Sequence, residues 1–91
     1  MSGEENEAAA HPKEFTIVVD TVEHTVDDET VTWKQVVEIA YPGQSDDPQY
    51  VFKVQYEDAK SKPHAGTLVK GGSVEVKKSG TTFSVLRSVV S

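Results

Sequence analysis

The stretch Val31-Thr-Trp-Lys-Gln-Val-Val-Glu-Ile-Ala-Tyr-Pro-Gly43 carries the clearest helix signals in this chain. Thr32 is followed three residues later by Gln35, the spacing of a capping box, in which each side chain bonds the other residue's backbone N–H. This pattern predicts a helix that begins at Trp33. Because proline and glycine do not continue a helix, we expect Pro42-Gly43 to end it after about three turns.

One face of this predicted helix is apolar. The residues at positions i, i+3, i+4 and i+7 are Trp33, Val36, Val37 and Ala40. Residues with this spacing form one stripe along a helix, and such a stripe packs against another layer of structure. We therefore expect Trp33 to lie in the core rather than on an exposed binding surface.

Strand patterns lie on both sides of the helix. β-branched and aromatic residues alternate with other side chains over residues 15–20, 24–27, 50–56, 74–76 and from 81 onward. Residues 15–20 are apolar on both faces, as expected for a central strand. The polar segment 57–66 predicts a surface loop, and Lys78-Ser79-Gly80 predicts a turn before the last strand.

The order of elements is thus strand, strand, helix and three further strands. A single short helix covers only one face of a sheet, which gives an α+β fold of two layers. We predict a β-grasp: a mixed sheet of four to five strands, with one helix packed across it and the first and last strands parallel at its centre. The domain is expected to span residues 14–91, after a disordered acidic tail at 1–13.

Composition narrows the functional classes. The chain has 91 residues, no cysteine and a net charge of −6, with no apolar run near the roughly 18 residues of a membrane span. We expect one cytoplasmic domain without membrane attachment. Residues 1–47 carry twelve acids and two lysines (−10), whereas residues 48–91 carry three acids and seven bases (+4). This asymmetry either steers a partner or serves solubility.

No group of residues predicts catalysis, a cofactor or a metal. His11, His24 and His64 have no nucleophile motif near them. The acidic residues at 27–29 and 46–47 lack the spacing of a calcium loop. Gly71-Gly72 is not followed by a phosphate-loop lysine, and the lysines are not interleaved with aromatic residues. We therefore expect neither an enzyme nor a nucleic-acid-binding protein.

Three segments resemble a known family. They are the helix start Thr32-Trp-Lys-Gln-Val-Val37, the segment Gly66-Thr-Leu-Val-Lys-Gly-Gly-Ser-Val-Glu-Val76, and Thr82-Phe-Ser-Val85. With them, residues 15–85 resemble the bacterial ubiquitin-like proteins of multiubiquitin type, and the ending at Val85-Leu-Arg87 is similar to that of ubiquitin. The resemblance implies a protein modifier that is served by an E1-like activating enzyme, an E2-like carrier and a deconjugating peptidase, and is attached to target proteins.

The carboxyl-terminal residues depart from this family pattern. Ubiquitin-like modifiers usually end in Gly-Gly, because their enzymes hold the tail in a slot that excludes side chains. The corresponding conjugation and processing tail here is Ser88, Val89, Val90 and Ser91. Either the enzymes are adapted to this tail, or conjugation does not occur and the protein is a noncovalent adaptor.

The outer face of the sheet is the candidate binding surface. If Phe83 and Val85 face the helix, alternation along the strands directs other apolar side chains to solvent. A shift of one residue would exchange the two faces of the last strand. The residues assigned to this protein-binding surface are Val18, Val51, Leu86 and Arg87.

Overall fold

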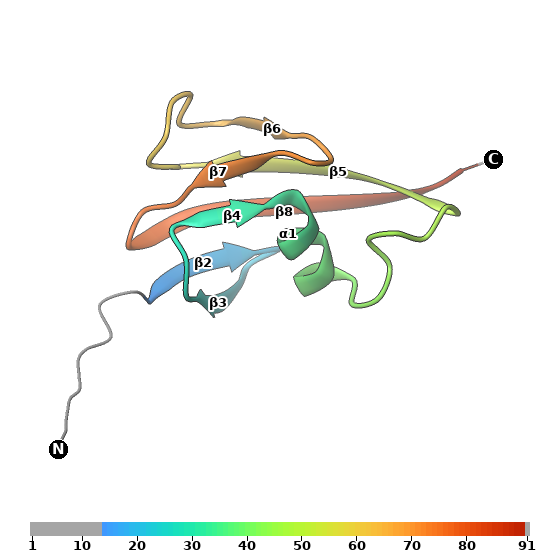
Figure 1. Ribbon diagram of the computed structural model, residues 1–91, viewed down its shortest axis with the longest axis horizontal. Helices are drawn as coiled ribbons and strands as arrows, with labels where there is room; N and C mark the ends of the chain where they lie inside the picture. Colours follow the sequence, from blue (N-terminus) through green and yellow to red (C-terminus); the bar gives the residue numbers. More distant parts are fainter. Residues whose placement is uncertain (1–13, 91) are drawn as a thin grey trace, which may run out of the picture.

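A five-stranded sheet with one helix on one face forms the body of the protein (Figure 1). The structure is a computed structural model that describes residues 14–90, so the expected tail at 1–13 and residue Ser91 lie outside the described residues. Across the sheet the strands are β3 (Val22–Val26), β2 (Phe15–Val19), β8 (Ser79–Val89), β5 (Tyr50–Glu57) and β6 (Gly66–Leu68). The helix is α1 (Trp33–Ala40).

The first and last strands of this sheet are parallel. β2 pairs with β8 in parallel at the centre, whereas β2 with β3, β5 with β8 and β5 with β6 pair antiparallel. A second, two-stranded sheet joins β4 (Thr30–Thr32) to β7 (Ser73–Glu75). The mixed sheet with one helix across it confirms the predicted β-grasp.

The capping box forms as predicted. The Gln35 backbone N–H donates to Thr32 Oγ1 at 3.1 Å, and the Thr32 backbone N–H donates to Gln35 Oε1 at 2.9 Å. The helix has eight residues, a little over two turns, and is therefore shorter than expected. Tyr41 already leaves helical geometry at φ −137° and ψ 78°, because a residue before proline disfavours the helical conformation.

The core lies between α1 and the inner face of the sheet. Trp33 is only 5% exposed, and its ring meets that of Phe52 edge to face at 6.1 Å between centroids. The prediction that Trp33 belongs to the core is confirmed. The other buried apolar side chains come from all the elements but β3: Ile17, Val19, Val31, Val36, Val37, Phe52, Val54, Tyr56, Leu68, Val74, Phe83 and Val85, with Ala59 and Val76 from loops.

Two strands were not predicted, and the strand predicted at 74–76 belongs to the second sheet. β6 consists of the last residue of the predicted loop and two residues that were not assigned to any element. Its Leu68 pairs with Val54, so β6 is the fifth strand of the main sheet. The strand predicted at 74–76 instead pairs as β7 with β4, which was also missed. Three-residue strands carry too little alternation to be distinguished from loop without knowledge of their partners.

Strand boundaries at two turns also differ from the prediction. The β2–β3 turn consists of Asp20 and Thr21, with φ values of 50° and 72°, so β3 begins at Val22. Two residues with positive φ are typical of a tight hairpin. The last strand, β8, begins at Ser79, within the turn that was predicted at 78–80. Gly80, with φ at 98°, lies where the register between β8 and β2 shifts.

Candidate interaction surface and carboxyl-terminal strand

The two faces of β8 are distinct. Phe83 and Val85 are 2% and 8% exposed and face α1, so their inward assignment is confirmed. Leu86 is 63% exposed on the opposite, outer face. Successive side chains of a strand alternate between faces, which places Ser84 and Ser88 on the outer face with Leu86.

Two of the predicted surface residues lie close together. Leu86 is paired with Lys53, and Val51 is paired with Ser88, so Leu86 and Val51 are diagonal neighbours on the outer face. Val51 is 57% exposed. We call Val51, Lys53 and Leu86 the outer patch; it combines two apolar side chains with one positive charge.

Val18 is separate from this patch. It is half-buried on β2 and paired with Thr82, four residues before Leu86 along β8. At about 3.3 Å per residue, this places it roughly 13 Å from Leu86 along the strand. The outer face therefore does not bring all the predicted aliphatic residues into one cluster.

Arg87 lies on the other face of the sheet, contrary to its assignment to the binding surface. Its guanidinium carbon is 4.8 Å from the ring centroid of Tyr41 and 4.5 Å from that of Tyr50. One of its nitrogens donates to Gln44 Oε1 at 2.8 Å. Neighbouring residues of a strand point to opposite faces, so Arg87 cannot share a face with Leu86.

The predicted conjugation tail is largely part of the sheet. Ser88 and Val89 belong to β8 and pair with Val51 and Tyr50, and the Val90 N–H donates to the Gln49 carbonyl at 2.8 Å. The resemblance to ubiquitin implied a strand that ends at Arg87. Here β5 begins early enough to pair with two further residues, and Ser91 lies outside the described residues.

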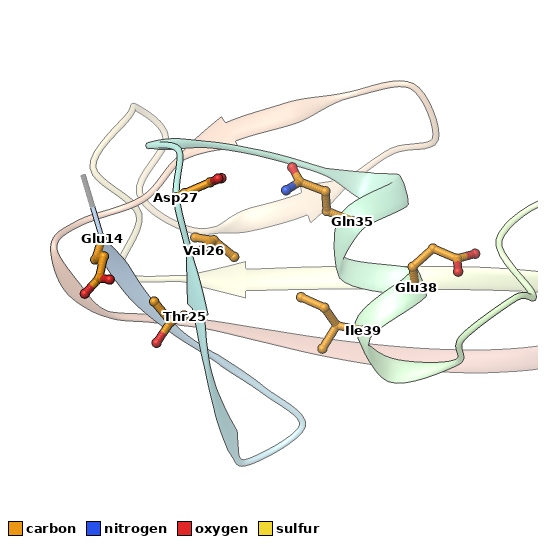
Figure 2. Close-up of a pocket in the computed structure, with 7 residues that line it drawn as sticks. All are labelled: Glu14, Thr25, Val26, Asp27, Gln35, Glu38 and Ile39. Atoms are coloured by element: carbon orange, nitrogen blue, oxygen red, sulfur yellow. The ribbon is translucent and has the colours of Figure 1, made fainter. Parts of the chain in front are cut away.

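A groove between β3 and α1 was not predicted (Figure 2). It has a volume of about 520 Å³, and it is lined by Glu14, Thr25, Val26, Asp27, Gln35, Glu38 and Ile39. Val26 and Ile39 supply its apolar surface, and three carboxylates lie around it. The signal that indicates it in the sequence is Ile39, an apolar residue outside the helix stripe.

Glu38 anchors the loop that follows α1. Its carboxylate accepts hydrogen bonds from the backbone N–H groups of Gly43 at 2.8 Å and Ser45 at 3.0 Å. The pKa of Glu38 is lowered by the nearby Ser45 hydroxyl, by these two N–H groups and by the charge of Lys34. The hydroxyl of Ser45 is buried beside this carboxylate, although its geometry is not that of a regular hydrogen bond.

Two further polar contacts involve the residues that follow β5. His64 Nδ1 lies 2.9 Å from the Ala59 carbonyl, and Glu29 forms an ion pair with Lys60, whose pKa it raises. Within residues 14–90, no group of three or more histidine or acidic side chains is arranged to hold a metal ion. No helix in that same range is long and apolar enough to cross a membrane.

Comparison with known proteins identifies a family. The model of the Multiubiquitin family matches residues 15–88, which include the helix and every strand of the fold except the last residue of β8. No curated protein and no solved structure gives a significant match. The match covers most of the chain and agrees with the β-grasp sheet, so this chain belongs to the Multiubiquitin family and is a ubiquitin-like protein.

Proposed function

We propose that this protein is a ubiquitin-like modifier of a bacterial conjugation pathway, activated through its carboxyl end in the cytoplasm. The observation that supports this most directly is the position of the end of β8. The strand passes through the centre of the sheet and continues past the end of β2, still paired with β5 as far as Val89 (Figure 1). Val89 and Val90 are both exposed there, 70% and 51% respectively. An enzyme can therefore approach this end without unfolding the core.

The proposed partners are an E1-like activating enzyme, an E2-like carrier, a deconjugating peptidase and target proteins. In activation, the terminal carboxylate attacks the α-phosphate of ATP and displaces pyrophosphate, which yields an acyl adenylate. The carboxylate is then part of a mixed anhydride whose leaving group is AMP. A thiol of the enzyme attacks the acyl carbon and displaces AMP, which gives a thioester. Since Ser88, Val89, Val90 and Ser91 include no glycine, an enzyme slot that binds these residues must accommodate two valine side chains.

Activation is tested by ATP–pyrophosphate exchange. The 91-residue chain with a free carboxylate at Ser91, incubated with its E1-like enzyme and ATP, is expected to support exchange, because adenylation is reversible. The same chain with a terminal amide is the control, and it should give none. Exchange that persists with the amide, or is absent with the free acid, contradicts activation at this position. Eukaryotic activating enzymes, which accept Gly-Gly tails, should be inactive toward either form.

The second candidate function is a noncovalent adaptor, and the outer patch favours it. Val51 and Leu86 expose adjacent aliphatic surface beside Lys53. Exposed apolar groups that lie together on a flat sheet are a usual feature of protein-binding surfaces. The two functions are compatible with the same patch, because a modifier also has to be recognised by its enzymes.

Replacing Leu86 by aspartate is expected to weaken binding of the E1-like enzyme about tenfold, because it introduces a charge where apolar contact is proposed. The melting temperature should change little, since Leu86 is largely exposed. Calorimetric titration measures the affinity. The matched control is Val22→Asp, because Val22 is 56% exposed but lies on the edge strand β3, away from the outer patch. An equal loss of affinity in both variants would count against the outer patch.

A further inference from the structure

The end of β8 has one unpaired edge. Pairing of β8 with β2 stops at Phe83, whereas its pairing with β5 continues to Val89. The tight turn at Asp20 and Thr21 takes the chain away from β8 at this point. From Leu86 to Val89, β8 thus has a neighbouring strand on one side only among the described residues.

The backbone groups on this edge can be assigned. The Asp20 N–H donates to the Phe83 carbonyl at 2.9 Å, and Asp20 Oδ1 accepts from the Val85 N–H at 3.0 Å. Residues 83 and 85 therefore direct their backbone groups toward β2. Because this direction alternates along a strand, the N–H and C=O groups of Arg87 and Val89 point to the open side. The Val90 N–H fits the same alternation, because it points to the β5 side and donates to the carbonyl of Gln49, the residue before β5.

The side chains on this edge differ between the two faces of the sheet. Leu86 exposes an apolar side chain on the outer face, and Val89 is also exposed. Arg87, on the inner face, contacts two tyrosine rings and Gln44 but forms no ion pair with a carboxylate of residues 14–90. An open edge with apolar and charged side chains on its two faces is suited to strand addition, in which backbone bonds give affinity and side chains give specificity.

We propose that the edge of β8 from Leu86 to Val89 is a docking site for an extended segment of a partner protein, with an acidic residue between two apolar residues. Side chains of directly paired residues lie on the same face. The residue opposite Arg87 is therefore acidic, and its two neighbours lie on the outer face beside Leu86 and Ser88. This site does not depend on activation of the carboxyl end.

The same edge of a second copy of this chain is a poorer occupant. Residues 85–90 read Val-Leu-Arg-Ser-Val-Val and include no acidic residue. Pairing of two such edges would leave both Arg87 guanidinium groups without a carboxylate, or place them opposite each other. Like charges that are directly opposite in a sheet destabilise the pairing. Charge complementarity therefore favours a different, acidic segment.

The test uses a synthetic peptide, acetyl-Thr-Val-Glu-Val-Thr-amide, and the ¹⁵N-labelled chain. Before addition, the amides of Arg87 and Val89 should exchange rapidly and those of Leu86 and Ser88 slowly. The peptide should shift the resonances of Arg87 and Val89 and slow their exchange. Replacing its glutamate by lysine should weaken binding about three- to tenfold, because the cross-strand charge pair becomes repulsive. The variant Arg87→Glu should reverse this preference.

Val89→Pro is the sharpest variant. The N–H of Val89 points to the open side, so proline there removes no bond to β5 but blocks strand addition. Val89→Ala is the matched control, because it keeps the N–H group. We expect loss of peptide binding in the proline variant only, with similar melting temperatures for both. Any one of four results would overturn the proposal. They are equal binding by both variants, resonance shifts confined to β3 or β6, no binding at millimolar peptide, and resonance shifts that occur without peptide and rise with protein concentration.

Discussion

Trp33→Ala is expected to lower the free energy of unfolding by about 3 to 5 kcal/mol, which is much of the stability of so small a domain. Trp33 is 5% exposed at the start of α1 and packs edge to face on Phe52. Its loss leaves a cavity between the helix and β5 that the surrounding strands cannot fill. It also removes the ring over which the Lys70 ammonium lies, 5.7 Å from the centroid.

The measurement is urea denaturation followed by circular dichroism, because the chain has one tryptophan and the variant has no indole fluorescence. Trp33→Phe is the control, since it retains an aromatic ring and should cost clearly less. The alanine variant should be largely unfolded near 37 °C. If its melting temperature fell by only a few degrees, Trp33 would not be part of the core as the structure places it.

The features that could be predicted from the sequence are those determined by neighbours along the chain. The capping box at Thr32 and Gln35 depends on residues three apart, and it forms as predicted. Alternation along β8 and β5 depends on spacing of two, and it assigned Phe83 and Leu86 to the correct faces. The order of these elements then leaves few arrangements for one helix and a sheet, which is why the β-grasp could be predicted.

The features that could not be predicted depend on partners far along the chain. β6 exists because Leu68 meets Val54, and β7 pairs with β4 because Val74 meets Val31. The extension of β8 into the tail depends on where β5 begins. Nothing within Ser88-Val-Val-Ser91 distinguishes a strand from a free end.

The candidate site shows the same division. Alternation correctly indicated exposed aliphatic groups at Leu86 and Val51. Their proximity, and the separation of Val18 from them, depend on the register between strands. The stacking of Arg87 between Tyr41 and Tyr50 depends on the path of the loop after α1, which Glu38 holds through backbone N–H groups.

A buried hydroxyl illustrates how long-range bonds join these elements. Thr81 is fully buried in β8, and its Oγ1 donates to the Asp58 carbonyl at 2.7 Å and accepts from the Lys77 N–H at 3.0 Å. Asp58 follows β5 with φ at 59°, and Lys77 precedes β8. A single side chain thus satisfies backbone groups in two turns at the same end of the sheet.

Thr81→Val is expected to lower the free energy of unfolding by about 1 to 3 kcal/mol, because valine has nearly the same shape but leaves the Lys77 N–H and the Asp58 carbonyl without their partner. Thr81→Ser is the control: it keeps the hydroxyl and loses one methyl group. Denaturation gives the stability, and amide exchange at Lys77 separates the causes. Exchange should accelerate in the valine variant and stay slow in the serine variant. If the Lys77 amide were equally protected in both variants, the Thr81 hydroxyl would not be its partner. The valine variant should then be at least as stable as the serine variant, because valine retains the volume of the buried side chain.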